Sequence, residues 1–186
     1  MKIVAFGHRK LVGKDTAAKF LVSHVSTTRK GLSIKVAGFA DKLKSVCCDL
    51  YRWSGLMPGE FYEQPENAHL KGVKLPLIGM SPREIWIKFA NSIRDWRMDT
   101  WYQYLLSTVK CDLLVVKDMR FPNEADGILQ RGGHVYRITR AAAPIEDDGA
   151  DDQLIGYDRW TGTIENDGTL RDLHEKVVEV AERIFR

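Results

Sequence analysis

The sequence contains no long apolar run, so it predicts no membrane-spanning helix, which needs about 20 consecutive apolar residues. The apolar stretch after Met1 is too short for a secretory signal, and we therefore expect a cytoplasmic protein. Cysteine is scarce as well. Cys47, Cys48 and Cys111 form no C-x-x-C pair and no zinc-ligand spacing, so we expect reduced thiols that pack in the core.

The net charge is low, at +3 over 186 residues, and the sequence has no array of stacking aromatics and no recognition helix. We therefore expect no nucleic-acid partner. The charge is unevenly distributed, however. Residues 1–44 contain ten Lys and Arg against Asp15 and Asp41, whereas residues 146–152 contain five acidic residues and no basic one. A basic N-terminal quarter favours an anionic ligand, with a plain solvated face as the alternative.

Short apolar runs alternate with segments of helical periodicity along most of the chain. This alternation predicts the α/β class, with a parallel sheet flanked by helices, in a single domain over residues 1–186. Expected strands are 2–6, 32–39, 113–117, 134–139 and 163–165, and expected helices are 15–25, 40–53, 81–96, 99–109, 123–131 and 169–184. The Gly- and Pro-rich residues 54–80 receive no assignment, and the acidic residues 141–160 are expected to form a loop.

The segment Gly7–Thr16, which reads GHRKLVGKDT, lies between an expected strand and an expected helix. This is the setting of a phosphate-binding loop. The N–H groups at the start of a helix have no partner within it, and together with the helix dipole they bind phosphate oxygens. Gly13 would let the backbone approach the phosphates, and Lys14 would reach the outer ones. Arg9 and Lys10 would add positive charge.

The loop departs from the standard pattern at its first glycine and after its lysine. Five residues separate Gly7 from Gly13, so His8 stands where the first glycine is expected. Asp15 follows the lysine in place of Ser or Thr, and Thr16 comes one residue later. The carboxylate of Asp15 could bind Mg²⁺ directly or through water. The alternative interpretation is a lysine-containing turn that caps a helix.

A second cluster, Asp118, Arg120 and Glu124, follows the buried-strand pattern at 113–117. Because the carboxyl ends of parallel strands share one sheet edge, we expect this cluster to lie near the phosphate loop. Asp118 would orient Mg²⁺ or activate the acceptor, and Arg120 would neutralise charge on the transferred group. The alternative is a structural ion pair at the entry to a helix.

Several motifs occur in consistent order over nearly the whole chain. They are GKDT at Gly13–Thr16, FADKLK at Phe39–Lys44, SPREI at Ser81–Ile85, DMRFPNEADGILQRGGHVYRITR at Asp118–Arg140 and NDGTL at Asn166–Leu170, together with Trp101. In these motifs the chain resembles the bacteriophage deoxynucleoside monophosphate kinases. The resemblance implies an adenylate-kinase-like P-loop NTPase fold and transfer of the ATP γ-phosphate to a dTMP-, dGMP- or dCMP-type acceptor, with ATP and Mg²⁺.

The resemblance also implies roles for individual residues. The ATP-binding residues would be Gly7–Thr16, Arg137, Asn166 and Gly168. The catalytic residues would be Lys14, Asp118 and Arg120, and the metal ligands would be Asp15 and Asp118. The acceptor would be bound by Lys44, Arg83, Trp101, Arg120 and Glu124. For Trp101 the alternative is a plain core aromatic. Water must be excluded during transfer, so we expect residues 54–80 to form an acceptor-side flap and residues 141–160 a donor-side lid.

The chain differs from the family in two elements: the central helix lacks Q-x-x-G-T, and residues 144–160 lack His-x-Ser-Glu. These differences leave the acceptor base open. Another P-loop kinase of the phosphomevalonate or dephospho-coenzyme-A type remains an alternative, as does a nucleotide-binding protein without transfer activity. Members of the family are often dimers, so a homodimer is also open. A phage-encoded enzyme would work in the host cytoplasm.

Overall fold

The structure is a computed structural model, and it describes residues 1–143 and 153–186. The chain divides into two compact units. Met1–Gly38 and Leu105–Arg186 form the first, called here the sheet unit, and Phe39–Tyr104 form the second, called the helical unit. The helical unit is thus a single insertion into the sheet unit, and it contains the segment 54–80.

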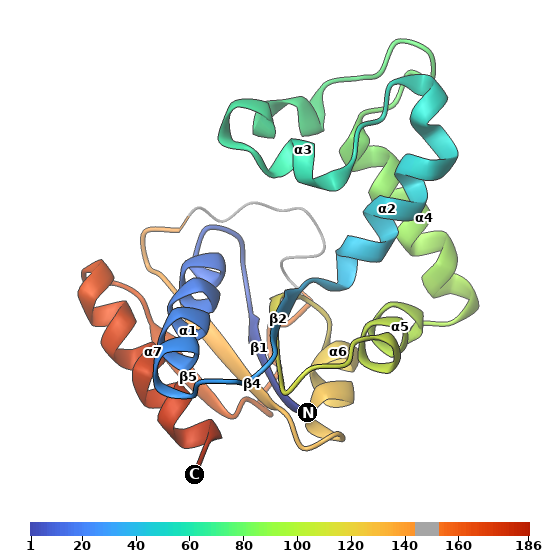
Figure 1. The fold of residues 1–186 in the computed structure, drawn as a ribbon. Helices are drawn as coiled ribbons and strands as arrows, with labels where there is room; N and C mark the ends of the chain where they lie inside the picture. Colours follow the sequence, from blue (N-terminus) through green and yellow to red (C-terminus); the bar gives the residue numbers. More distant parts are fainter. Residues whose placement is uncertain (144–152) are drawn as a thin grey trace. The chain divides into compact units, whose positions relative to one another are not determined.

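Five parallel strands form the sheet, in the order β2-β3-β1-β4-β5 (Figure 1). Their bounds are β1 Lys2–Gly7, β2 Ile34–Ala37, β3 Leu113–Met119, β4 His134–Thr139 and β5 Gly162–Glu165. The strands are rich in β-branched and other apolar residues because both faces of the sheet are covered. The predicted parallel α/β sheet is confirmed, since all five strands lie within about two residues of the expected ranges.

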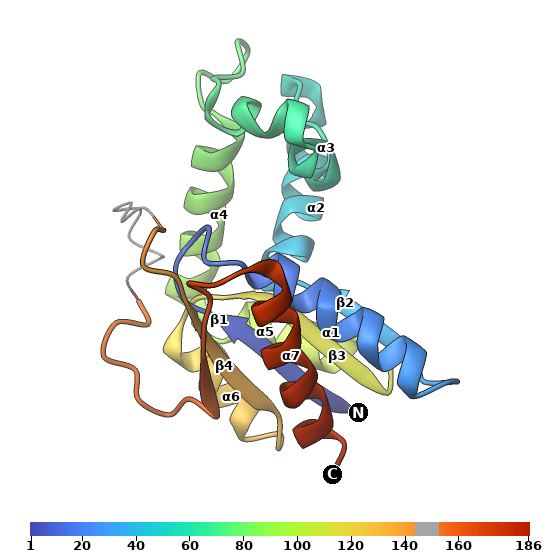
Figure 2. The same ribbon diagram turned by 90° about the vertical axis from the view of Figure 1, so that its left-hand side faces the viewer.

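Helices cover both faces of this sheet. Helices α1 (Lys14–Thr28) and α7 (Leu170–Ile184) pack side by side on one face, and α6 (Pro122–Leu129) lies on the other (Figures 1 and 2). Helix α7 begins where the sequence predicts, because the Thr169 hydroxyl accepts from the Asp172 N–H and the Asp172 carboxylate accepts from the Thr169 N–H. The sheet unit therefore has three layers, with the sheet between two layers of helices.

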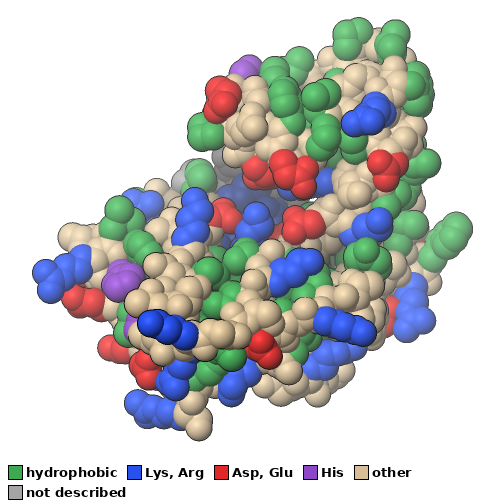
Figure 3. Space-filling view, viewed as in Figure 1, with side chains coloured by type: hydrophobic (Ala, Val, Ile, Leu, Met, Phe, Trp, Pro, Cys, Tyr) green, Lys and Arg blue, Asp and Glu red, His purple; other side chains and the backbone are tan. Residues whose placement is uncertain are grey.

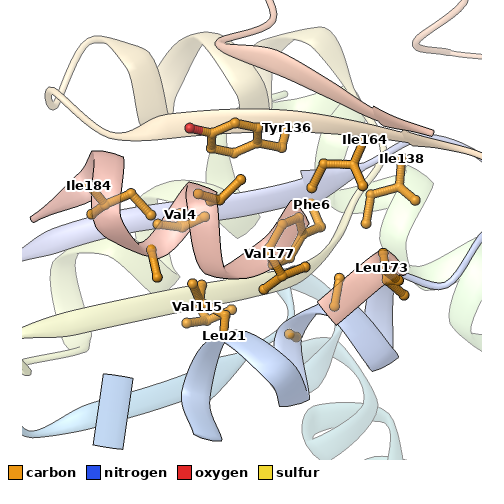
Figure 4. Close-up of a cluster of buried hydrophobic side chains, with 14 of the residues drawn as sticks. Val4, Phe6, Leu21, Val115, Tyr136, Ile138, Ile164, Leu173, Val177 and Ile184 are labelled. Atoms are coloured by element: carbon orange, nitrogen blue, oxygen red, sulfur yellow. The ribbon is translucent and has the colours of Figure 1, made fainter. Parts of the chain in front are cut away.

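The core of the sheet unit lies between the strands and the α1–α7 pair (Figure 4). Alternate residues of a strand point to opposite faces, so every second strand residue reaches this core. Its members labelled in Figure 4 are Val4, Phe6, Leu21, Val115, Tyr136, Ile138, Ile164, Leu173, Val177 and Ile184. A packed layer of this kind holds the carboxyl ends of the strands in fixed positions.

The helical unit consists of short and medium helices. They are α2 Phe39–Tyr51, η1 Arg52–Ser54, α3 Gly59–Glu63, η2 Pro65–Gly72 and α4 Pro82–Trp96, and α5 Thr100–Thr108 leads back into the sheet unit. Helix α4 begins within one residue of its expected start, at a capping box in which Ser81 and Glu84 each accept from the other's backbone N–H. The helical turns of 59–72 were not predicted.

The surface of the helical unit carries exposed hydrophobic side chains, which Figure 3 shows in green. The large exposed ones include Leu50, Trp53, Met57 and Trp96. Cys47 and Cys48 are buried on α2 as expected, whereas Cys111, which was also expected in the core, is only half-buried. Burial raises the pKa of the Cys47 thiol to about 11. All three cysteines are free thiols. Within residues 1–143 and 153–186, no helix has the length and apolar character needed to cross a bilayer.

Candidate functional site

The loop between β1 and α1 leaves the carboxyl end of the central strand. Its backbone enters the left-handed region three times, at His8 (φ 102°), Leu11 (φ 57°) and Gly13 (φ 103°). Residues with a side chain rarely adopt this conformation, so the surrounding structure must hold His8 and Leu11 in it. The loop therefore has one specific curled shape.

Gly13 is the N-cap residue of α1, and as a glycine it offers no side-chain acceptor to the N–H groups of the first turn. Asn166, which follows β5, packs against this glycine. A Cβ atom at position 13 would lie 2.5 Å from the Asn166 amide nitrogen, and that nitrogen donates to the Val12 carbonyl at 2.9 Å. Asn166 therefore supports the loop from the end of β5 and makes glycine necessary at position 13.

Lys14 folds back over the loop that precedes it. Its side chain is only 9% exposed, and its ammonium donates to the carbonyl oxygens of His8, at 2.9 Å, and of Arg9. A buried ammonium is costly unless it is paired with acceptors or an anion. These two contacts hold the ammonium of Lys14 against the loop that the sequence predicts to bind phosphate.

His8 and Arg137 meet at the edge of this loop. The guanidinium Nη2 of Arg137 lies 3.2 Å from Nε2 of the His8 imidazole. Burial, followed by the positive charge of Arg137 and two further cations, lowers the pKa of His8 to about 4. The further cations are Arg9 and Lys14. The imidazole is thus neutral near pH 7, and the electrostatic environment of the loop is strongly positive.

Asp118 lies near the end of β3, the strand next to β1. A Cβ atom at Gly38, just after β2, would lie 2.5 Å from a carboxylate oxygen of Asp118. The ladder pairs Gly7 with Met119, so Asp118 stands at the same sheet edge as the phosphate loop. The expected proximity of this aspartate to the loop follows from the parallel register.

Glu124, the third member of the predicted cluster, is 4% exposed. Its carboxylate accepts from the backbone N–H groups of Arg120, at 2.9 Å, and Phe121, at 3.1 Å. Glu124 therefore caps the N-terminus of α6 through backbone N–H groups, whereas the alternative stated from the sequence was an ion pair with a side chain. The Arg120 side chain is half-buried at the same turn.

Trp160 was not singled out from the sequence, yet its ring covers the start of the phosphate loop. Ring atoms of Trp160 lie 3.0 Å and 3.1 Å from the position of a Cβ atom at Gly7. Tyr157 packs edge-on against Trp160, and its hydroxyl donates to Asp126 of α6 at 2.8 Å. This part of the predicted lid therefore packs on the sheet unit. Residues 144–152 of that lid lie outside the described residues.

The remaining predicted ATP-site residues also lie in the sheet unit. Arg9 and Lys10 are half-buried on the loop, Asp15 is exposed in the first turn of α1, and Thr16 is half-buried. Gly168 lies in the turn before α7 and packs against Asp172. The structure thus brings together Gly7, His8, Gly13, Lys14, Arg137 and Asn166 by direct contact or strand register.

The predicted acceptor residues of the helical unit have their own environments. The Lys44 ammonium lies 2.7 Å from Glu63 and 5.3 Å from the ring centre of Trp86. Arg83 is exposed in the first turn of α4. Trp101 is 7% exposed, lies against Phe89 and donates to the Ala90 carbonyl at 3.5 Å. Trp101 is therefore built into the core of this unit.

A metal ion at the loop would have a limited set of protein ligands. Among the residues that the structure describes, no three His, Cys, Asp or Glu side chains form a group that could hold a metal ion. Asp118, at the sheet edge, and Asp15, in the first turn of α1, supply single carboxylates. Such a set fits Mg²⁺, which keeps several waters and binds one or two carboxylates together with substrate phosphates.

No protein-family model matches the chain. A protein of Acanthamoeba polyphaga mimivirus, described as a "Putative deoxynucleotide monophosphate kinase", is 23% identical over an alignment of 184 positions, and the match covers 89% of this chain and 89% of that one. Among solved structures, shikimate kinase from Acinetobacter baumannii in complex with shikimate superposes with a TM-score of 0.50 at 15% identity, over 98% of this chain and 94% of that one. Shikimate kinase from Aquifex aeolicus gives a TM-score of 0.45 at 9% identity, over 97% and 96%. Together with the strand order, the Acinetobacter structure shows that the chain has the P-loop NTPase fold, as predicted.

Proposed function

We propose that this chain is a P-loop kinase that transfers the γ-phosphoryl group of ATP to a deoxynucleoside monophosphate and releases the diphosphate. The observation that carries the kinase part is the curled loop before α1, with Lys14 buried against it. The acceptor class is supported by the similarity to the mimiviral protein over 89% of both chains. The family motifs, distributed from Gly13 to Leu170, support the same acceptor.

ATP would bind with its phosphates on the loop. N–H groups of the first turn of α1 would donate to phosphate oxygens, and the helix dipole would add attraction. Lys14 would exchange its bonds to the loop carbonyls for bonds to the β- and γ-phosphates. Because the loop shape is already set by His8, Leu11 and Gly13, little ordering would remain to be done on binding.

Transfer between two phosphates mainly requires alignment and charge compensation. Lys14, Arg120 and Arg137 would offset the charge of the donor and of the transferred group. Mg²⁺, when bound, would neutralise charge on the β- and γ-phosphates, with Asp118 and Asp15 as its protein ligands. In the helical unit, Lys44 and Arg83 would bind the acceptor phosphate, since each is a cation at a position that matches the family motifs.

A coupled assay of ATP consumption tests this proposal directly. The acceptors would be dTMP, dGMP, dCMP and dAMP, with their ribose counterparts, and phosphomevalonate and dephospho-coenzyme A as competitors. We expect ADP release that depends on at least one deoxynucleoside monophosphate and exceeds the rate of a folded Lys14→Ala protein. Transfer to phosphomevalonate or dephospho-coenzyme A alone would contradict the acceptor class. Tight ATP binding without transfer to any acceptor would contradict the kinase itself.

A further inference from the structure

His8 is an unexpected residue at its place in the loop. It occupies the position of the first glycine of the standard pattern and adopts φ 102°, a conformation that is strained for a residue with a side chain and unstrained for glycine. A strained conformation persists only where the surroundings impose it, and such strain is concentrated at functional sites. The imidazole must therefore make a contact that a glycine cannot make.

That contact is with Arg137. The imidazole is part of a residue that is 8% exposed, and its Nε2 lies 3.2 Å from Nη2 of Arg137. A guanidinium can only donate hydrogen bonds, so Nε2 of His8 must be the acceptor and its ring proton must sit on Nδ1. The histidine acts here as a neutral acceptor for a cation.

Arg137 is placed so that it can also reach a ligand. It pairs with Gly7 in the ladder between β4 and β1, and therefore stands beside the first residue of the phosphate loop. Its Nε is buried and has no hydrogen-bond partner among the described residues. A buried donor without an acceptor is unfavourable, and a phosphate oxygen would satisfy it.

We propose that His8 is a positioning residue, whose imidazole holds the Arg137 guanidinium at the phosphate loop so that Arg137 binds the phosphoryl group during its transfer. The proposal rests on the proposed kinase function. A transferred phosphoryl group carries its charge on three oxygens, and a guanidinium fixed in advance stabilises that charge without reorganising. The strain at His8 is thereby connected to the orientation of a catalytic cation.

Two substitutions of His8 separate this role from a purely structural one. His8→Gly removes the acceptor and relieves the strained backbone, so we expect an unchanged or higher Tm and a kcat lowered about tenfold, with KM for ATP changed by less than about threefold. His8→Gln keeps an acceptor oxygen near the place of Nε2, and we expect kcat within about threefold of the wild type, at no gain in Tm. If activity followed Tm across these proteins instead, His8 would have only a structural role.

A double-mutant cycle with Arg137 tests the coupling. Arg137→Ala should lower kcat by about a hundredfold, and adding His8→Gly to it should change kcat by less than about twofold, because the positioned group is already gone. If the two substitutions lowered kcat independently, so that the double variant lost the product of the two single losses, the proposal would be overturned. A full kcat in either single variant would also overturn it.

An NMR measurement tests the hydrogen bond between His8 and Arg137 independently of activity. Ring ¹⁵N shifts of His8 at pH 7 should show the Nδ1–H tautomer, and Arg137→Ala should shift the ring toward the Nε2–H tautomer. If the wild-type enzyme transferred phosphate to no acceptor but this tautomer were present, the kinase function would fail while the pairing stood. An Nε2–H tautomer in the wild type would overturn the pairing whatever the activity.

Discussion

The two units of the chain differ in whether their titratable side chains are buried or exposed. In the sheet unit, His8, Lys14 and Glu124 are buried, at 8%, 9% and 4% exposure, and each is held by backbone or by a neighbouring cation. In the helical unit the buried polar residues are Ser54 and Ser81, and charges such as the Lys44–Glu63 pair stay near the surface.

This difference indicates which part of the protein must hold its functional side chains in fixed positions. Burying a titratable group requires a rigid frame of hydrogen bonds and packed side chains, and such groups are concentrated at functional sites. The sheet unit provides that frame around the proposed ATP phosphates. The helical unit instead offers exposed cations and aromatics, which suit a substrate that binds and leaves. The following substitutions would break or sharpen this contrast.

The largest expected effect is on stability, in a matched pair of leucines. Leu21 of α1 is fully buried in the core of the sheet unit, whereas Leu50 of α2 is 53% exposed. Leu21→Ala should lower the free energy of unfolding by about 2–5 kcal/mol, because it leaves a cavity, and Leu50→Ala by less than about 0.5 kcal/mol. Urea denaturation of both variants measures this, and equal losses would contradict the contrast.

The next effect is on catalysis, again with a matched control. Lys14→Ala should lower kcat at least about a hundredfold, the size expected for one preorganised electrostatic group. Lys19 lies on the same helix but is exposed, so Lys19→Ala should retain full turnover. Steady-state kinetics on both proteins, with circular dichroism to confirm folding, give the comparison. A fully active Lys14→Ala protein would remove the loop from the mechanism.

In the helical unit we expect an effect on acceptor binding alone. Arg83→Ala should raise KM for the acceptor about tenfold, because an exposed cation that binds a phosphate contributes about 1.4 kcal/mol, and should leave KM for ATP unchanged. Arg94→Ala, at the other end of α4, serves as the control. A weaker ATP affinity with normal acceptor affinity would show that Arg83 belongs to the donor side.

The last effect concerns pH and stability. The pKa of His8 is lowered to about 4, and in the unfolded chain it returns to about 6.5, so the unfolded state binds more protons between these values. The stability associated with neutral His8 is complete above about pH 6.5 and is lost as the pH falls toward 4, at up to about 1.4 kcal/mol per pH unit. Thermal melts from pH 7 to pH 5 should therefore show His8→Gly gaining on the wild type. If the difference in Tm between His8→Gly and the wild type stayed constant from pH 7 to pH 5, His8 would not be a buried neutral histidine.

Much of the fold could be predicted because its signals are local. Buried strands read as short apolar runs, and the starts of α4 and α7 follow from Ser81 with Glu84 and from Thr169 with Asp172. The turns of 59–72 were missed because Gly and Pro are usually signs of loops, while here Pro65 stands at the start of a helical segment.

The candidate site was only partly predictable. The loop and Lys14 follow from a spacing that the sequence displays, and the nearness of Asp118 follows from parallel strands. The contacts of His8 with Arg137 and of Trp160 with Gly7 join residues more than a hundred positions apart, so no local pattern encodes them. The one available signal was the presence of a histidine where the loop calls for glycine.

Asn166 bears on how any mutational study of this protein would be interpreted. Its backbone N–H donates to the Thr139 carbonyl at the end of β4, while its side chain donates to Val12 on the other side. Removing that amide would release the curve of the loop and would also remove any contact of Asn166 with the adenine base, if it is this part of ATP that Asn166 binds. A weaker nucleotide affinity in Asn166→Ala would thus be ambiguous between base and phosphate, and only a comparison of ATP with inorganic triphosphate would tell the two losses apart.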